Sequence, residues 1–315
     1  MSDIHEHEVV IKGNVTIRGT LALPEKTTEA CPAILFIHGS GPTDRDENAN
    51  GLKINAFKEL SDALVPSGYA ALRYDKRGVG ESEGDYISAG FWDLVDDARA
   101  ALDFLKQDPR IDARRIILLG HSEGCIIAPA LNARQAVQGL ILLAGIAEPF
   151  GEIVARQERR IFREFEETKG VKGLLIRWFG VVKRAQKAQA ESMQKLMESQ
   201  EDVVKMKLQK INAKWLREHF AYNVVDDLAH VTCPVLAITG DKDLQVLPEH
   251  AEIIAELVQG DAEYHIIKDM NHLLRIQKEP GSLLSLNKIY KESVKQPVDP
   301  DLILLIKNWL DRNYK

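Results

Sequence analysis

The chain has 315 residues, a length that allows two domains or one large α/β domain carrying an insertion. Of these residues 45% are apolar and 28% are charged, as in an ordinary globular protein. Its 41 Lys and Arg residues against 47 Asp and Glu residues give a net charge of −6, which disfavours nucleic acid as a partner. No apolar run approaches the roughly 18 residues needed to cross a bilayer, so we expect no membrane partner.

The amino terminus and the cysteines bear on the cellular compartment. Residues 1–8 are polar and acidic and lack the apolar stretch of a signal peptide. The three cysteines, Cys31, Cys125 and Cys233, are odd in number and far apart, which argues against a disulfide scaffold. We therefore expect a protein of the reducing cytoplasm. Nothing in the sequence indicates an oligomeric state.

The first part of the chain predicts a β-hairpin, because residues 8–11 and 15–21 are rich in β-branched side chains and flank a Gly-Asn turn. Farther along, several short apolar runs end close to Gly or Asp, as is typical of strands buried on both faces of a parallel sheet. These runs cover residues 33–37, 70–74, 116–119, 140–143, 235–239 and, with a more polar composition, 263–267.

Amphipathic helical patterns lie between these runs. Apolar residues share one helical face within residues 57–64, 94–105, 253–258 and 302–310. Strands that alternate with helices predict an α/β fold with a mostly parallel central sheet flanked by helices, and the first hairpin should form an antiparallel edge.

Residues 150–230 interrupt this alternation. They contain no convincing strand-like run, and from Met193 onward their large apolar residues recur mostly every three to four positions, the helical period. We interpret them as an all-helical insertion within a core domain of residues 1–149 and 231–315. The insertion is predicted to be a cap over the crevice at the sheet edge, and the alternative is a solvated helical hairpin that only covers the sheet.

The sequence Gly120-His121-Ser122-Glu123-Gly124 follows a predicted strand directly and precedes a helical pattern. In this context a G-x-S-x-G motif predicts a tight turn that exposes a serine at the end of the strand. The positions two before and two after the serine must be small, and both are glycine. The N–H groups at the start of the helix favour developing negative charge.

A serine hydroxyl becomes a strong nucleophile when a base lies within hydrogen-bond reach and a third group orients the base. Asp241 and Asp243 follow the strand predicted at 235–239, and His272 follows the strand predicted at 263–267. Each lies just past a strand end, where side chains can converge on Ser122. The order Ser, Asp, His along the chain is that of the α/β-hydrolase arrangement.

With these motifs, the chain resembles an α/β-hydrolase-fold serine esterase over nearly its whole length. Residues 38–42 (HGSGP), 72–82 (LRYDKRGVGES), 120–124 (GHSEG) and 271–273 (NHL) resemble those of a bacterial group of carboxylesterases. The resemblance implies the α/β-hydrolase fold and a helical cap insertion. It does not fix the substrate.

The resemblance also implies roles for individual residues: Ser122 as nucleophile, Asp243 as the acid of the triad and His272 as the base. In the family the acid usually stands three residues after the glycine that ends the strand, a position that Asp243 occupies. We interpret Asp241 as a turn residue and Asp269 as part of a loop.

The oxyanion of the reaction needs two N–H donors directed at one point. One should be the backbone N–H of Glu123, the residue after the nucleophile. By resemblance the residue after His-Gly supplies the other, which gives Ser40, with Gly41 as the next choice. We interpret His38 and His121 as structural.

Three hypotheses follow for the function. The first is a hydrolase that cleaves small carboxylic esters through an acyl-serine intermediate, with no cofactor and no metal. The second is a serine aminopeptidase or thioesterase with the same triad, in which Glu164, Glu166 and Glu167 are candidates to bind the substrate amine of the aminopeptidase. The third is a non-enzymatic binding protein on this fold.

Overall fold

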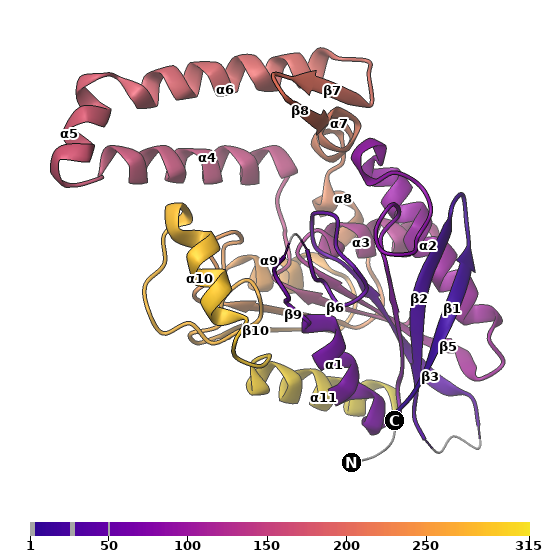
Figure 1. Ribbon diagram of the computed structural model, residues 1–315. Coiled ribbons are helices and arrows are strands. Elements are labelled where there is room, and N and C mark those ends of the chain that lie inside the picture. The colour runs from indigo at the N-terminus through magenta and orange to yellow at the C-terminus, as the bar shows by residue number, and fades with distance from the viewer. Residues whose placement is uncertain (1–3, 26–28, 50) are drawn as a thin grey trace.

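The computed structural model describes residues 4–25, 29–49 and 51–315, and its centre is an eight-stranded sheet (Figure 1). The strands are β1 His5–Lys12, β2 Thr16–Leu23, β3 Cys31–Ile37, β4 Ala70–Tyr74, β5 Ile111–His121, β6 Gly139–Leu143, β9 Val235–Gly240 and β10 Ala262–Ile267. Their order in the sheet is β1-β2-β4-β3-β5-β6-β9-β10. Only the pairs β1–β2 and β2–β4 are antiparallel among these neighbours. The predicted α/β fold with an antiparallel edge hairpin is confirmed.

Helices cover both faces of this sheet. They are α1 Ala56–Leu64, α2 Phe91–Gln107, α3 Gly124–Arg134, α9 His250–Leu257 and α11 Pro300–Tyr314. A further helix, α10 Leu286–Ser293, and 3₁₀ turns at Val65–Ser67, Tyr86–Ser88 and Leu283–Ser285 lie in the connections. Helices α1 and α11 contribute to the apolar core on one face, and α2, α3 and α9 contribute to the core on the other. Helix α10 was not among the predicted helices.

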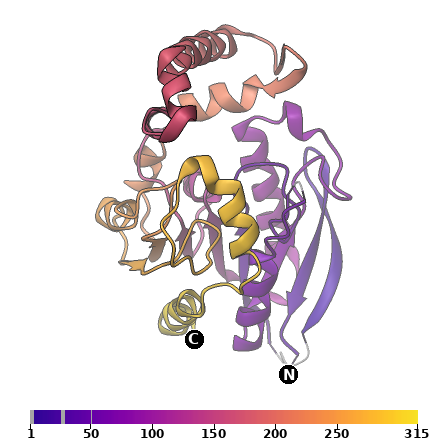
Figure 2. The same ribbon diagram turned by 60° about the vertical axis from the view of Figure 1, so that its left-hand side comes forward.

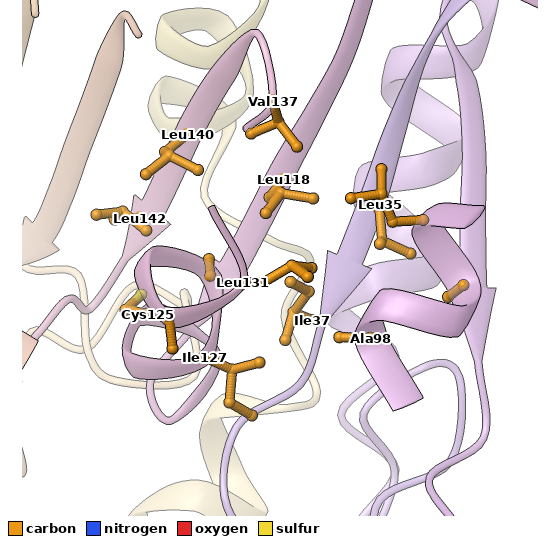
Figure 3. Packing of buried hydrophobic residues seen from close by; sticks show 14 of the residues in the cluster. Leu35, Ile37, Ala98, Leu118, Cys125, Ile127, Leu131, Val137, Leu140 and Leu142 are labelled. Atoms are coloured by element: carbon orange, nitrogen blue, oxygen red, sulfur yellow. The ribbon is translucent and has the colours of Figure 1, made fainter. Parts of the chain in front are cut away.

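The central strand β5 shows why the predicted strands are continuously apolar. Ile117 and Leu119 belong to the core beneath α1 and α11, whereas Ile116 and Leu118 belong to the core beneath α2 and α3. Figure 3 shows Leu118 on the side of the sheet that α3 covers, near Leu131. Because successive side chains of a strand point to opposite faces, a strand covered on both sides needs apolar residues at every position.

The carboxyl ends of the parallel strands meet at one edge of the sheet. Residues 38–41 follow β3, Ser122 follows β5, Asp243 follows β9 and His272 follows β10. Ligands of open α/β sheets bind at this edge. The topology therefore gathers the predicted site residues in one region.

The part of residues 150–230 from α4 to α7 extends beyond this edge as an arm, mostly of helices (Figures 1 and 2). The elements of residues 150–230 are α4 Phe150–Glu166, α5 Gly170–Trp178, α6 Val181–Glu198, β7 Val203–Met206, β8 Gln209–Asn212, α7 Ala213–Ala221 and α8 Val224–Leu228. Helices α4 and α6 run side by side, and α5 joins them at the outer end of the arm.

The expectation of an all-helical insertion is wrong at residues 203–212, which form the antiparallel hairpin β7–β8. Val204 pairs with Ile211 across the hairpin and packs with Leu196 in a small core of the arm. Leu208, one of the apolar residues that recur at about the helical period, is 96% exposed in the turn between the strands. The spacing of these apolar residues fits both periods, and the turn at Lys207, with φ of 56°, selects the strand.

The last helix of the segment, α8, lies on the core rather than in the arm. Val224 and Leu228 are buried in the same apolar cluster as Leu118, and α8 contacts α3. Among the described residues, no helix combines the length and the apolar composition that crossing a bilayer requires.

Candidate active site

Ser122 occupies the sharp turn between β5 and α3. Strand β5 ends at His121 and α3 begins at Gly124, as the G-x-S-x-G motif predicts. The backbone of Ser122 has a φ of 52°, in the left-handed region that a non-glycine residue seldom adopts, and its N–H donates to the Leu143 carbonyl at 3.0 Å. The turn exposes a half-buried hydroxyl at the edge of the sheet.

Two glycines make this turn possible. A Cβ atom on Gly120 would lie 2.4 Å from the carbonyl oxygen of Gly124. A Cβ atom on Gly124 would lie 2.0 Å from the carbonyl oxygen of Ile37, at the end of β3. Both distances are far below van der Waals contact, so the expectation that these positions must be small is confirmed.

The structure brings Ser122, His272 and Asp243 into one chain of hydrogen bonds. Nε2 of His272 lies 3.1 Å from Oγ of Ser122, and Nδ1 of His272 lies 2.7 Å from Oδ2 of Asp243. The other carboxylate oxygen of Asp243 accepts from the N–H groups of Gln245 at 2.8 Å and Val246 at 2.9 Å. These bonds fix the carboxylate in the orientation that a catalytic triad requires.

The other acidic candidate, Asp241, does not contact His272. Its carboxylate accepts from the N–H of Asp269 at 2.6 Å, and Asp269 itself has a φ of 61°. Both residues therefore shape the loops beside the triad, in agreement with their interpretation as turn and loop residues.

The loop after β3 lies directly beside Ser122, because a Cβ atom on Gly39 would lie 3.3 Å from that of Ser122. The N–H of Gly39 donates to Glu47 at 2.8 Å, and the N–H of Gly41 donates to the hydroxyl of Tyr86 at 2.9 Å. Within the described chain, the N–H groups of Ser40 and Glu123 have no protein acceptor. The two N–H groups predicted to hold an oxyanion are thus open, whereas that of Gly41 is occupied.

A buried ion pair connects the two segments that carry these N–H groups. Nζ of Lys76 lies 2.9 Å from Oε2 of Glu123 and donates to the carbonyl oxygen of Gly39 at 2.5 Å, and both charged side chains are at most 3% exposed. Burial alone would raise the pKa of Glu123, but Lys76 and His219 outweigh it and hold the pKa well below its ordinary value. Burial tends to lower the pKa of Lys76, but Glu123 raises it above its ordinary value. Both groups stay charged at neutral pH.

The same carboxylate also contacts the arm. Nε1 of Trp215 on α7 donates to Oε1 of Glu123 at 2.6 Å, and Nε2 of His219 lies 3.0 Å from that oxygen. The rings of Trp215 and His219 lie against each other with centroids 4.1 Å apart. Glu123 therefore joins the nucleophile turn to both the loop of Ser40 and helix α7.

Sequence reasoning did not find Lys76, Trp215 or His219. The available signal was Glu123 itself, since a carboxylate at a turn between a buried strand and a buried helix needs cationic or hydrogen-bonding partners. The sequence does not show which residues these are, because they lie 47 and 92 positions away for Lys76 and Trp215.

A second buried pair holds the backbone of His272. Nδ1 of His121 lies 2.9 Å from Oε1 of Glu47, and Nε2 of His121 lies 2.8 Å from the carbonyl oxygen of His272. Both partners are acceptors, so only the doubly protonated imidazolium donates to both. Burial alone would lower the pKa of His121, but Glu47 outweighs it and raises the pKa. His121 thus supports the triad through the backbone.

His38 and Cys125 lie near the site but have no part in this chain of hydrogen bonds. His38 is fully buried, and burial lowers its pKa to about 4, so it is neutral. Burial raises the pKa of the Cys125 thiol well above its ordinary value, which keeps it from acting as a thiolate nucleophile. No cluster of three or more His, Cys, Asp or Glu residues within the described ranges is arranged to hold a metal ion.

Lys76 holds together the two segments whose N–H groups would bind the oxyanion, and such donors act in the transition state. We therefore predict that Lys76→Met lowers kcat on the order of 10–100-fold with little change in KM. Stability should also fall by about 3–5 kcal/mol, since Glu123 keeps a buried charge without its lysine. The matched control is Arg77→Met, which breaks the buried pair of Arg77 with Asp97 away from Ser122. Steady-state kinetics and thermal unfolding separate the two effects, and equal kcat values in the two variants would refute a role for Lys76 in positioning.

We also predict a pH dependence of stability from His121. Its folded-state pKa lies above the ordinary 6.5, so its contribution to stability is complete below that value and is lost as the pH rises through the raised pKa. Glu47→Gln removes the carboxylate that raises the pKa of His121. Above pH 6.5 the contribution of His121 to the free energy of unfolding should therefore fall with pH in the wild type but not in the variant. Chemical unfolding over a pH series measures both slopes, and parallel slopes would contradict the assignment.

Comparison with known proteins agrees with this geometry. The family model described as serine aminopeptidase, S33, matches residues 50–279. Esterase EstD of Thermotoga maritima is 25% identical over 271 residues, which cover 85% of this chain and 60% of the relative. The chain thus matches less than two thirds of that relative's length.

Solved structures show the same fold. Est1E of Butyrivibrio proteoclasticus, solved with ferulic acid bound, is 20% identical with a TM-score of 0.58, over 91% of this chain and 96% of that one. A thermophilic esterase of Thermogutta terrifontis is 19% identical with a TM-score of 0.57, over 98% of this chain and 100% of that one. The fold is that of the α/β hydrolases, and the chain belongs to the serine aminopeptidase S33 family within it.

Proposed function

We propose that the protein is a serine hydrolase that cleaves small carboxylic esters through an acyl-serine intermediate. The observation that carries this proposal is the chain from Asp243 through His272 to Ser122, at 2.7 and 3.1 Å. A hydroxyl so placed has a base within reach and a carboxylate that orients the base. The names of the Thermotoga maritima relative and of the Thermogutta terrifontis structure, both called esterases, support the same reaction.

In the acylation step, Nε2 of His272 accepts the proton of Ser122 as Oγ attacks the ester carbonyl carbon. The carbonyl oxygen becomes an oxyanion that accepts hydrogen bonds from the N–H groups of Ser40 and Glu123. When the tetrahedral intermediate collapses, the bond to the alcohol oxygen breaks and His272 returns the proton to the leaving alcohol. Ser122 then carries the acyl group as an ester.

Deacylation repeats these steps with water. His272 takes a proton from the water, hydroxide oxygen adds to the acyl carbon, and the proton passes to Oγ of Ser122 as the acid leaves. The carboxylate of Asp243 accepts from two N–H groups and from the imidazole, which holds the ring in place. Its charge stabilises the imidazolium that forms in each step.

The hydrogen bonds of Glu164, one of the carboxylates that would bind the amine of an aminopeptidase substrate, favour an ester as the substrate. Glu164 accepts from the N–H groups of Leu283 and Leu284, each at 3.2 Å, and from Arg160 at 3.3 Å. Burial alone would raise its pKa, but these donors lower it. This carboxylate anchors the turn before α10. The family description keeps an aminopeptidase as the second candidate.

The domain division and the compartment remain part of the proposal. We assign residues 150–230 to the cap, because α7 reaches Glu123 beside the nucleophile while α4 to α6 extend beyond the sheet edge (Figure 2). The free cysteines, of which Cys31 and Cys125 are buried, suit a reducing cytoplasm. The partner is a small ester, with no nucleic acid.

The direct test is Ser122→Ala with p-nitrophenyl acetate as substrate. The variant lacks the nucleophile, so kcat should fall by roughly 10⁴-fold or more. Ser40→Ala is the control, because its proposed donor is in the backbone and survives the substitution. Comparing p-nitrophenyl acetate with alanine p-nitroanilide in the wild type distinguishes ester from aminoacyl amide. Undiminished turnover by Ser122→Ala would defeat the proposal, and preference for the anilide would favour the aminopeptidase.

The choice between the two aspartates has its own test. Asp243→Asn should reduce kcat on the order of 10³–10⁴-fold, because an amide favours the wrong tautomer of His272. Asp241→Asn keeps an oxygen that accepts from Asp269 and should leave kcat near the wild-type value. The measurement is turnover of the same ester by the two variants. A larger loss in Asp241→Asn would reverse the assignment.

A further inference from the structure

Helix α5 lies at the outer end of the arm (Figure 1), and several of its apolar side chains are exposed to solvent. Val171, Leu174, Leu175 and Trp178 are 75%, 58%, 50% and 81% exposed. They stand at positions i, i+3, i+4 and i+7, which share one face of a helix. In a globular protein such a face normally packs on the core, so an exposed one indicates a surface that binds something.

The apolar surface continues past the end of α5. Phe179 is 56% exposed and Val181, at the start of α6, is 46% exposed. We call these six residues, from Val171 to Val181, the tip surface. Other exposed apolar residues of the described chain, such as Leu208 and Leu304, lie on different elements.

The segment that carries the tip surface is rich in basic residues. Residues 168–190 contain six basic residues and no acidic residue, although the whole chain has a net charge of −6. The six are Lys169, Lys172, Arg177, Lys183, Arg184 and Lys187. Acidic residues flank the segment at Glu164, Glu166, Glu167 and Glu191. Of these, Glu164 is engaged by the N–H groups of Leu283 and Leu284, and Glu191 lies 3.9 Å from Lys187. Residues 168–190 are thus a basic segment of an acidic protein.

The combination of charge and apolar exposure selects the partner. A second copy of the chain docked tip to tip would bring two basic segments together, which like-charge repulsion opposes. Nucleic acid would use the charges and leave the aromatic and aliphatic side chains in water. We propose that the tip surface docks on an anionic lipid bilayer, with α5 in the interface and the basic residues at the headgroups.

This inference revises the expectation of no membrane partner, which rested on the lack of a spanning segment. Docking on the surface needs only a short amphipathic helix with basic flanks. Because α5 has nine residues, the association should be reversible and should weaken as salt rises. The docking goes beyond the proposed ester hydrolysis and does not depend on it.

The test is sedimentation of the full-length protein with vesicles of phosphatidylcholine alone or mixed with phosphatidylglycerol. Wild type should bind the anionic vesicles and not the neutral ones. Lys183→Glu with Arg184→Glu should weaken binding roughly thirtyfold or more, since each basic residue near such a surface contributes about fivefold. Trp178→Ser should weaken it too, by removing the most exposed member of the tip surface.

The controls match these changes away from the tip. Lys12→Glu with Arg114→Glu alters the net charge equally at other exposed positions, and Leu304→Ser removes an apolar residue that is 55% exposed on α11. Both should bind vesicles as wild type does, and all variants should hydrolyse a soluble ester at the wild-type rate. A wild-type protein that binds anionic vesicles but does not hydrolyse the ester would refute only the proposed function.

Three results would overturn the proposal: no sedimentation of wild type with anionic vesicles at low salt, equal sedimentation with neutral vesicles, or unchanged binding by the Lys183→Glu, Arg184→Glu variant. Light scattering during size-exclusion chromatography adds a fourth. A dimer that Trp178→Ser dissociates, without any vesicle binding, would assign the tip surface to a second copy instead.

Discussion

At the turn after β5, the backbone of Gly124 lies so close to β3 that an added Cβ would come within 2.0 Å of the Ile37 carbonyl. This contact between α3 and the end of β3 forces Ser122 into a left-handed conformation with a φ of 52°. The strained conformation lifts the hydroxyl away from the sheet, toward the loops that follow β9 and β10. The geometry of the triad and of the open N–H groups depends on that turn.

Glu123 extends the effect of the turn to the rest of the molecule. A carboxylate loses much hydration free energy when it is buried, and it is retained only where charges and donors compensate. Lys76 supplies a positive charge, Trp215 supplies a donor at 2.6 Å, and Nε2 of His219 lies 3.0 Å from the carboxylate. Lys76 comes from the loop after β4, whereas Trp215 and His219 come from α7. Through these residues, the turn of Ser122, the loop of Ser40 and the arm form one connected unit. The position of α7 is thereby coupled to the residue whose N–H would hold the oxyanion.

Much of this arrangement could be predicted from the sequence, because it is local. A strand buried on both faces is a continuous apolar run, which the sequence shows directly. Gly120 and Gly124 mark the tight turn between β5 and α3. The ends of neighbouring parallel strands meet, which brought Asp243 and His272 into consideration. The partners of Glu123 escaped prediction, because Lys76 and Trp215 lie 47 and 92 positions away in the sequence. The hairpin β7–β8 escaped for a local reason, since its apolar spacing also fits a helix.

The central claim is that Ser122 attacks a carbonyl carbon while the N–H groups of Ser40 and Glu123 hold the oxyanion. A crystal structure of the protein after reaction with a phosphonate ester tests it most directly, since the tetrahedral phosphorus mimics the intermediate. The account predicts phosphorus bonded to Oγ of Ser122, with one phosphoryl oxygen within hydrogen-bond distance of both N–H groups. An adduct on another residue, or a phosphoryl oxygen directed away from both N–H groups, would contradict it.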